Sequence, residues 1–541
     1  MIDRRSFFAG TAIAAGLPRF AIGQSDQRPS ITVAVQKISN SNTLEPLREQ
    51  SNVGERVMLT SLWEGLLGRD YAGRLETTPV LATETRRISD SVVELKLRQG
   101  VKFHNGEGMT AEDVAFSFGN ERMFGPGGPN SGSTIRVGEQ NPGRAGRELP
   151  IEVPAVANRS FPGFERIEIV DKYTVRWINR TPDVTLEGRL ARYGAEIGSR
   201  RGFAEAATWL DWARRPVTTG PYKVVEFHAD NSLTLAAHDE YWGGRPPLRQ
   251  LRFVEVPEVS SRVNGLLSGE YHFACDIPPD QIAGIERNRA FEVLGGTIPN
   301  HRLTVFDRNY AVLRDPRVRR AFTHAIDRQA IVDSLWAGRT IIPRGLQWEF
   351  YGDMYLADWS VPIYDLTEAR RLLREAGYRN ERVVLLSATD LPNLQGLTEV
   401  AADLMRRVGF NLDLVAMDWG TQIQRRTNRG PVDQGGFSAF CTTWEGLDTS
   451  VPGSHQPLRG NGANAWSGWP TSPKREALRD AWFDAADLPT EKRIAEDLQR
   501  NVWEEAPFVP LGQLRPQQAY RRGITGIIKG GPSLFWNVRR A

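Results

Sequence analysis

Histidine, cysteine and the carboxylates are the side chains most able to do chemistry, and their spacing here gives no catalytic pattern. Seven histidines stand at positions 104, 228, 238, 272, 301, 324 and 455, and no two of them have His-x3-His spacing. The two cysteines, Cys275 and Cys441, form no Cys-x2-Cys pair. Because a zinc site needs three or four such ligands held together, the spacing predicts no metal centre.

The phosphate-binding and nucleophile motifs of common enzymes are also missing. The chain has no Gly-x4-Gly-Lys-Ser/Thr loop, no Gly-x-Gly-x-x-Gly after a strand and no Gly-x-Ser-x-Gly elbow. Carboxylates are plentiful, but the sequence does not show which of them would flank a substrate bond. Together these absences favour binding over catalysis, and they predict no cofactor. A hydrolase acting on peptides or sugars is the competing interpretation.

Strand and helix patterns are interspersed along the chain and would position these side chains. Residues 31–35 and 92–97 have the composition of half-buried strands. Thr110 and Asp113 form the capping-box pattern of a helix start, and Asp315-Pro316 is a capping residue followed by proline at the first helical position. Further helices are expected from Asp327, from Asp365 or Thr367, from 474 to 487 and from 490 to 505. The mixture indicates an α/β protein, and 541 residues indicate at least two domains.

Residues 125–163 are crowded with glycine, proline, asparagine and serine. Strand-like patterns resume at 164–169 and 173–178, so we interpret the segment as a long irregular surface loop and not as a domain linker. Loops of this length are either functional or mobile, and the sequence does not distinguish the two.

The first 23 residues have the pattern of a cleavable export signal. Arg4-Arg5 precedes an apolar run at 7–17, which is too short to span a bilayer, and small residues follow up to Gly23. The arginine pair before 6–8 is similar to a twin-arginine signal, whereas Asp3, where Ser or Thr is usual, leaves general secretion open. Cleavage removes three arginines and one aspartate and leaves 65 basic and 64 acidic side chains. That balance argues against a nucleic-acid binder.

Export would permit a disulfide between Cys275 and Cys441. Their spacing does not establish contact, and a twin-arginine substrate folds before it reaches an oxidising compartment. We therefore favour two buried thiols, with a disulfide as the alternative. No cysteine stands directly after the signal region, so a lipid anchor is not expected, and the mature protein is expected to be free in the periplasm.

Seven stretches along nearly the whole chain resemble the family of ABC-transporter solute-binding proteins that carries peptides, nickel complexes and related ligands (family 5). They are LEP at 44–46, LRQGVKFHNG at 97–106 with MTAEDV at 109–114, TGPYK at 219–223, DEYWG at 239–243, LSGE at 267–270, DPRVRRA at 315–321 with AIDR at 325–328, and LLREAGY at 372–378. Asn105 and His272 stand where that family usually has aspartate. Seven matches in the family's order identify the chain as similar to its members throughout.

The resemblance implies an α/β fold with two lobes, a periplasmic binding protein of the class II type with mixed sheets and an extra inserted domain. Such lobes close on a ligand by hinge motion. The implied division has a first-lobe sheet domain from 24–58, 165–257 and 508–541, an inserted domain of that lobe at 59–164, and a second lobe at 258–507. The chain would then cross between the lobes near Val256-Pro257 and near Pro507 to Leu511.

For most motif residues the resemblance implies structural roles. The 98–113 segment is expected to build a hairpin and a capped helix, with structural roles for Lys102, Phe103, His104 and Asp113. Surface or ion-pair roles are expected for Arg317, Arg319 and Arg320.

The resemblance also implies candidate ligand-binding residues. Peptide-binding relatives hold the ligand's amino group with an acidic residue shortly after a tryptophan, and the matching stretch here runs through 441–452. Trp444 and Asp448 are therefore ligand-binding candidates, although their spacing is one residue longer and the second aspartate of the family pair is absent. Trp419 matches an upstream tryptophan of the family. The alternatives are a turn-forming role for Asp448 and core packing for both tryptophans.

The function implied is binding without catalysis. The chain would capture a small solute, with a short peptide as the leading ligand, and deliver it as a monomer to an inner-membrane ABC permease with separate ATPase subunits. A metal chelate, an opine or an oligosaccharide is the alternative ligand. A nickel-type ligand would call for a histidine in the cleft, and His455, the nearest to the candidate loop, is interpreted as an exposed loop residue. A chaperone or sensor built on the same fold is the third possibility.

Overall fold

The computed structural model describes residues 26–48, 61–71, 76–126, 128–129, 148–183, 186–191, 194–295, 300–306, 311–340, 342, 345–346, 364–444, 452, 455–514, 517–528 and 535–541. The expected export signal, Asp448 and most of the long loop lie outside these residues. Within them, no helix is both long and apolar enough to cross a membrane.

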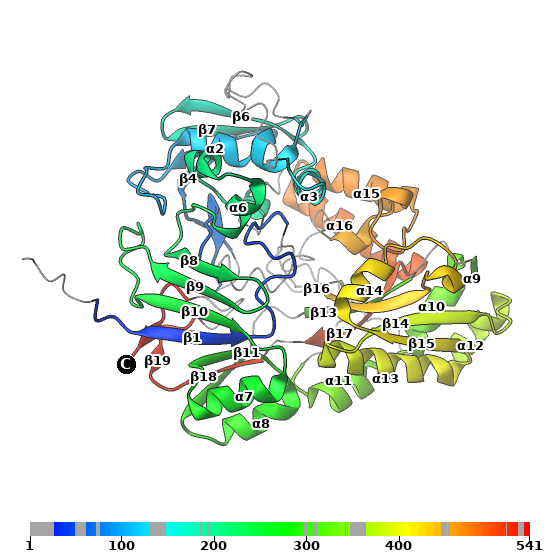
Figure 1. Ribbon diagram of the computed structural model, residues 1–541. Coiled ribbons are helices and arrows are strands. Elements are labelled where there is room, and N and C mark those ends of the chain that lie inside the picture. The colour runs from blue at the N-terminus through cyan, green and yellow to red at the C-terminus, as the bar shows by residue number, and fades with distance from the viewer. Residues whose placement is uncertain are drawn as a thin grey trace, which may run out of the picture.

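A seven-stranded mixed sheet forms the base of the first lobe (Figure 1), in the order β12-β18-β11-β1-β10-β9-β8. Its strands are β1 (Ser30–Val35), β8 (Tyr222–His228), β9 (Ser232–Ala237), β10 (Gln250–Glu255), β11 (Phe273–Ile277), β12 (Phe291–Gly295) and β18 (Gln517–Arg521). The strand expected at 31–35 is confirmed as β1, which pairs in parallel with β10 and β11. Helices α7 (Val259–Ser268) and α8 (Pro279–Glu286) pack on this sheet, and a short pair, β19 (Ile524–Thr525) and β20 (Arg539–Arg540), follows near the end of the chain.

A smaller unit lies above that sheet and contains a four-stranded antiparallel sheet in the order β4-β5-β7-β6. Its elements are β2 (Leu67–Arg69), β3 (Thr77–Pro79), β4 (Ala82–Ser89), β5 (Val92–Leu97), α2 (Ala111–Ser117), η1 (Asn120–Phe124), α3 (Glu152–Ser160), β6 (Phe164–Asp171), β7 (Thr174–Asn179), α4 (Leu186–Leu190), α5 (Arg200–Glu205) and α6 (Trp209–Arg214). The expected capping box is present at the start of α2, where Thr110 accepts from the helix and Asp113 reaches back.

The second lobe is built on a five-stranded sheet in the order β15-β14-β16-β13-β17. Its strands are β13 (Asn300–Phe306), β14 (Arg382–Ala388), β15 (Asn411–Met417), β16 (Ala439–Trp444) and β17 (Phe508–Leu514). Its helices are α9 (Ala311–Arg314), α10 (Pro316–Ala325), α11 (Arg328–Trp336), α12 (Leu366–Glu375), α13 (Pro392–Val408), α14 (Trp419–Arg425), α15 (Pro473–Phe483) and α16 (Leu488–Glu505), with short 3-10 turns η3 (Val432–Gln434), η5 (Gln456–Leu458) and η6 (Gly462–Asn464). The helices expected from Asp315, Asp327, Asp365 and residues 474 and 490 are confirmed, each within a few residues.

β14 shows how one strand serves two cores. Successive side chains of a strand point to opposite faces, and β14 is buried on both. Val383 and Leu385 join the cluster under α10 to α13, whereas Val384 and Leu386 join the cluster under α15 and α16. The central strand therefore reads as a continuous apolar run without alternation.

Strand pairing moves the expected domain boundaries. β11 and β12 pair into the first sheet, so the chain changes sheets between β12 and β13 and not near Val256-Pro257. β17 belongs to the second sheet, so the return comes between β17 and β18. In the same way, β6 and β7 pair with β5 in the smaller unit, which therefore extends past residue 164. Local patterns place strands along the chain but do not tell which distant strand each will pair with.

The motif segment around 97–114 has structural roles, as expected. Lys102 forms an ion pair with Glu240, and Phe103 is buried in the core of the first lobe. A ring nitrogen of His104 is 3.0 Å from the carbonyl oxygen of Gly220, and burial lowers the pKa of His104 to about 3. These contacts fasten the hairpin to the rest of the first lobe.

Three other motif side chains converge on Glu64 in the first lobe. Its carboxylate accepts from the Tyr241 hydroxyl at 2.6 Å, from Trp242 Nε1 at 3.0 Å and from the Thr219 hydroxyl at 2.7 Å. Burial raises the pKa of Glu64, and the three donors oppose that shift. Both oxygens of this desolvated carboxylate are thus satisfied by the protein itself.

One side chain, Arg319, differs from expectation, and the two cysteines agree with it. Arg319 is buried and donates to the carbonyl oxygens of Glu505 and Ala506, whereas a surface or ion-pair role was expected. Cys275 in β11 and Cys441 in β16 are buried thiols in different sheets, as favoured over a disulfide.

Candidate ligand-binding site

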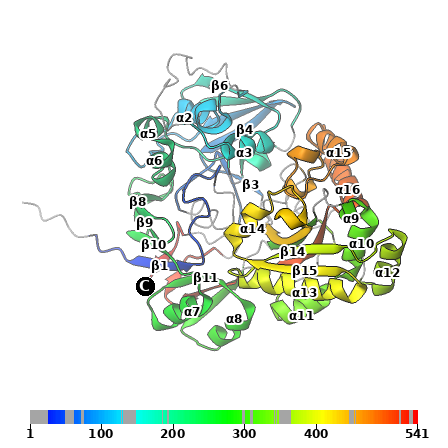
Figure 2. The same cartoon turned by 45° about the vertical axis from the view of Figure 1, so that its right-hand side comes forward.

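The carboxyl ends of three parallel strands, β14, β15 and β16, lie at one edge of the second sheet. Ligands commonly bind at this edge in α/β sheets, because the loops that leave it carry variable side chains. In both views α14, which follows β15 directly, lies on the side of the second lobe that is turned toward the first (Figure 1, Figure 2). This edge is therefore the candidate site.

Trp419 opens α14 at that edge. Asp418 caps the helix by accepting from the Thr421 backbone NH at 2.9 Å. Asp390, which follows β14, accepts from the Trp419 backbone NH at 2.7 Å. Residues at the ends of two neighbouring strands thus hold the backbone from which the half-buried Trp419 side chain extends.

Trp444 is the last residue of β16 and is also half-buried. Its ring meets the Trp466 ring edge to face, with centroids 5.1 Å apart. The indole Nε1 of Trp444 is buried and has no hydrogen-bond partner in the described part of the chain. A buried donor left unpaired costs about 1–3 kcal/mol, which makes it a natural partner for a ligand or for water.

Arg426 lies between Trp419 and Trp466, and Trp466 in turn contacts Trp444. Its guanidinium carbon lies 5.1 Å from the centre of the Trp466 ring, 5.5 Å from that of Trp419 and 5.5 Å from that of Phe440. No hydrogen bond or ion pair joins this guanidinium to any described residue. Burial lowers the pKa of Arg426 to about 10, so the group stays positively charged at neutral pH.

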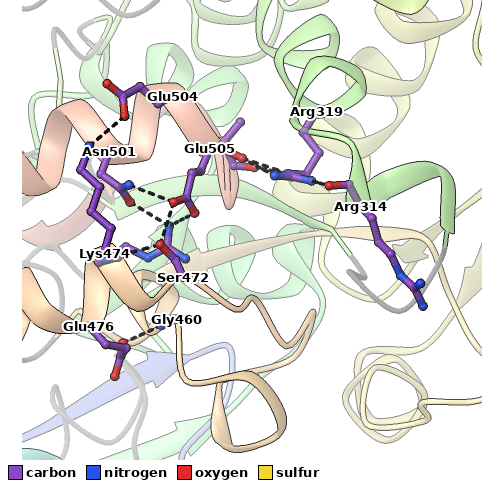
Figure 3. A network of polar contacts seen from close by, with 11 residues as sticks. Arg314, Arg319, Gly460, Ser472, Lys474, Glu476, Asn501, Glu504 and Glu505 are labelled. Atoms are coloured by element: carbon purple, nitrogen blue, oxygen red, sulfur yellow. Dashed lines mark hydrogen bonds and ion pairs between the residues drawn. The ribbon is translucent and has the colours of Figure 1, made fainter. Parts of the chain in front are cut away.

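The segment 460–472, which carries Trp466, is held at its two ends by the polar network drawn in Figure 3. The Gly460 backbone NH donates to Glu476 at 2.6 Å. The Ser472 hydroxyl donates to Glu505 at 2.7 Å, and Asn501 donates to the same oxygen at 2.9 Å. Both ends of the segment are thereby fastened to α15 and α16, so Trp466 is presented from a fixed support.

The two lobes also touch away from this edge. The Arg189 guanidinium of α4 lies 5.3 Å from the ring centre of Phe483 on α15 and 5.5 Å from that of Phe161. Asp183 holds Arg189 in a buried ion pair. This contact brings the smaller unit of the first lobe against the helical layer of the second.

The structure brings two of the three expected site residues into one cluster. Trp419 and Trp444 are connected through Arg426 and Trp466, whereas Asp448 lies outside the described residues. Arg426, Trp466 and Phe440 were missed from the sequence. One signal was available for Arg426, because it stands seven residues after Trp419 and so falls on the same face of a helix two turns later.

The position of His455 differs from the expectation. His455 was expected on the surface, but it is buried, with its ring stacked on Phe508 at 5.4 Å between centroids. Among the described residues, no group of three or more His, Cys, Asp and Glu side chains is placed to hold a metal ion.

A sequence model of the bacterial extracellular solute-binding proteins, family 5 (middle region), matches residues 76–466. The chain is 31% identical over 295 residues to a probable peptide ABC transporter periplasmic-binding protein, y4tO, of Sinorhizobium fredii, covering 53% of this chain and 55% of that protein. It therefore spans about half the length of that relative. It is 26% identical over 507 residues to the glutathione-binding protein GsiB of Shigella flexneri, covering 91% of each chain.

Solved structures share the fold. A dipeptide-binding protein from Pseudoalteromonas sp. SM9913 in complex with Met-Leu aligns with a TM-score of 0.78 at 21% identity, covering 95% of this chain and 100% of that one. The binding protein AgaA from A. tumefaciens R10, in complex with agropinic acid, aligns with a TM-score of 0.76 at 22% identity, covering 95% and 99%. The architecture is that of a two-lobed periplasmic binding protein.

Proposed function

We propose that this chain, which belongs to the bacterial extracellular solute-binding proteins of family 5, captures a short peptide between its lobes and delivers it to an ABC importer. The observation that carries the peptide assignment is the aromatic cluster at the strand ends of the second sheet. Half-buried rings supply apolar contact of adaptable shape, and an unpaired indole NH supplies a donor for a main-chain carbonyl. The names of two relatives, one for peptides and one for glutathione, agree with this ligand class.

The test is ligand discovery followed by titration. Protein purified from its native periplasm is analysed by native mass spectrometry, and the released molecules are identified. Peptides found in this way are then titrated by calorimetry, with small-angle scattering to measure compaction on binding. We expect one peptide per chain and a more compact particle, because binding energy favours the closed arrangement of the lobes. A co-purifying opine, metal chelate or oligosaccharide would replace the peptide assignment.

Binding without turnover is part of the proposal. We expect the ligand to be recovered unchanged after prolonged incubation with pure protein. The ligand should also stabilise the folded protein through mass action, by about 2.7 kcal/mol at a hundredfold excess over Kd. This stabilisation should appear as a higher melting temperature. Recovery of a cleaved ligand would favour the hydrolase interpretation.

Asp448 is proposed as the partner of the ligand's amino group. An ammonium that loses its water on lobe closure needs a charge-assisted acceptor, and a carboxylate after Trp444 supplies one. Asp448→Asn keeps the shape and removes the charge, so affinity for an amine-bearing peptide should fall by about 2–5 kcal/mol with little change in folding. Unaltered affinity would assign Asp448 to a turn in its loop.

Export to the periplasm by the twin-arginine route is proposed for the precursor, with action there as a monomer beside an inner-membrane permease and its separate ATPase subunits. The support is the Arg4-Arg5 pair before a short apolar run. Replacing both arginines by lysine should leave full-length precursor in the cytoplasm, detected by fractionation and immunoblotting. Normal processing of that variant would point to general secretion.

A further inference from the structure

Arg189 on α4 is held in place by the smaller unit of the first lobe. It forms an ion pair with Asp183, and each of the two side chains is only 5% exposed. Arg189 also donates to the carbonyl oxygen of Ser160 at the end of α3, and Asp183 accepts from the Asn179 side-chain amide at 3.2 Å. Because these contacts lie within one lobe, they persist when the lobes move as rigid bodies about a hinge.

The second lobe adds an aromatic ring to this buried cation. Phe483 is the last residue of α15, and its ring centre lies 5.3 Å from the guanidinium carbon of Arg189. Within its own lobe the ring meets Trp482 edge to face, with centroids 5.0 Å apart. Cation–π attraction is strongest where water is excluded, as it is around this ion pair. Parting the lobes takes the ring away and admits water, while Asp183 stays with Arg189.

Another contact between the lobes lies at the opposite end of the molecule. The Arg339 guanidinium, which follows α11, donates to the Glu286 carboxylate of α8 at 3.0 and 2.8 Å. Figure 1 shows α8 and α11 at the bottom of the molecule and α3 and α15 nearer the top. Strand β12, after which the chain crosses to the second sheet, follows α8 directly, so this ion pair lies near the hinge. Opening a hinge moves distant points most, and it therefore separates Phe483 from Arg189 far more than Arg339 from Glu286.

We propose that the contact between Arg189 and Phe483 is a latch that keeps the two lobes together in the absence of ligand. Opening the lobes loses the cation–π attraction, so the latch raises the fraction of closed chains. A ligand that binds the closed form then binds more tightly in proportion to that fraction. Both residues lie outside the seven stretches that resemble the family and outside the aromatic cluster at the strand ends. The inference rests on the proposed capture of a ligand between the lobes, but on no particular ligand.

The test measures the lobe arrangement of the whole chain after bound ligand has been removed. Exposed Glu152 on α3 and exposed Asp480 on α15 are replaced by nitroxide-labelled cysteines, while the buried native thiols stay unlabelled. Double electron–electron resonance gives the populations of short and long distances between the labels. In this labelled reference protein we expect the short distance to predominate. Phe483→Leu, which keeps apolar bulk but no ring face, should lower the ratio of short to long distances by about 5- to 30-fold.

Further variants assign the effect to the ring. Phe483→Trp offers a stronger ring face and should keep at least the reference ratio. Arg339→Gln removes the interlobe ion pair near the hinge and is the matched control, which should leave the ratio unchanged. Circular dichroism and thermal melting establish that each variant is folded, and Phe483→Met replaces the leucine variant if the latter does not fold.

The outcomes separate the latch from the proposed function. The same distance distribution in the reference protein and in folded Phe483→Leu, whether short or long, would overturn the latch and leave ligand capture untouched. An equal shift in Arg339→Gln would also overturn it, because the loss of any interlobe contact would then suffice. Adding the ligand identified from the native protein should return Phe483→Leu to the short distance, at a higher concentration than the reference protein needs. A ligand that closes neither protein would overturn the proposed capture, while the ligand-free comparison still decides the latch.

Discussion

Glu64 in the first lobe and Arg426 in the second are both half-buried charges whose pKa values are shifted by burial, but their partners differ. The Glu64 carboxylate receives three hydrogen bonds from Thr219, Tyr241 and Trp242. The Arg426 guanidinium meets three aromatic rings and has no acceptor among the described residues. The Glu64 arrangement is complete by itself, whereas the Arg426 guanidinium has donors without an acceptor in the described part of the chain.

The two centres also differ in how they relate to the stretches that resemble the family. The partners of Glu64 lie inside two of the recurrent stretches, TGPYK at 219–223 and DEYWG at 239–243. Arg426, Trp444 and Trp466 lie outside all seven stretches. The side chains that complete the Glu64 centre therefore belong to the recurrent stretches, whereas Arg426 and Trp444, whose donors have no partner among the described residues, stand outside them.

The largest effect on stability is expected from removing the Glu64 carboxylate. Glu64→Leu leaves three donors without an acceptor, and we expect the free energy of unfolding to fall by about 3 kcal/mol. Urea denaturation followed by tryptophan fluorescence measures it, with Glu64→Gln, which keeps one acceptor, as the milder control. Ligand affinity of the folded variant should be unchanged. A variant with normal stability but weakened binding would reverse the roles assigned to the two regions.

Removing one of the aromatic rings around Arg426 should weaken ligand binding. Trp466→Leu takes away the ring nearest to Arg426 and lets water reach the cation, so ligand affinity should fall by about 2 kcal/mol. Calorimetry with the ligand identified from the native protein measures this change. Trp466→Phe keeps a ring face and should lose less. If both variants bind as wild type does, the aromatic cluster is core packing and not a ligand wall.

A pH experiment sharpens the description of the first lobe. Glu196 is buried beside the Glu45–Arg122 ion pair, and burial raises its pKa to about 8. Between its ordinary value and 8 the folded protein keeps a proton that the unfolded chain releases, so stability falls as pH rises. From pH 6 to pH 7 we expect a loss of about 1.4 kcal/mol from this group, which Glu196→Gln should abolish. Parallel stability profiles of the two proteins would contradict the raised pKa.

The smallest effect is expected at Arg429. Its guanidinium lies over Trp469 but is exposed and already bonded to the Ala463 carbonyl oxygen. Arg429→Gln should lower stability by about 0.5 kcal/mol, as for exposed cation–π pairs, and leave ligand affinity as it is. Thermal melting and calorimetry give both numbers. A large loss of affinity here would show that the candidate site extends beyond Arg426.

Local elements were predictable because their causes lie close together in the sequence. The capping box at Thr110 and Asp113, the Asp315-Pro316 helix start and the strand at 31–35 each depend on residues within one or two turns. The order of seven recurrent stretches likewise pointed to the family and its two-lobed fold before any contact was known.

The tertiary structure alone decided which strands pair and which charges meet. β11 joins the first sheet and β17 the second, although the resemblance implied the second lobe for β11 and the first lobe for β17. Arg426 is separated by 40 residues from Trp466, and no local pattern in the sequence places the Trp466 ring beside it. Hydrogen bonds within an element form between near neighbours, whereas the environment of a side chain is set by whatever the folded chain packs against it. For this reason the sequence indicated the fold and two tryptophans of the candidate site, and only the packing showed that Arg426 and Trp466 join them.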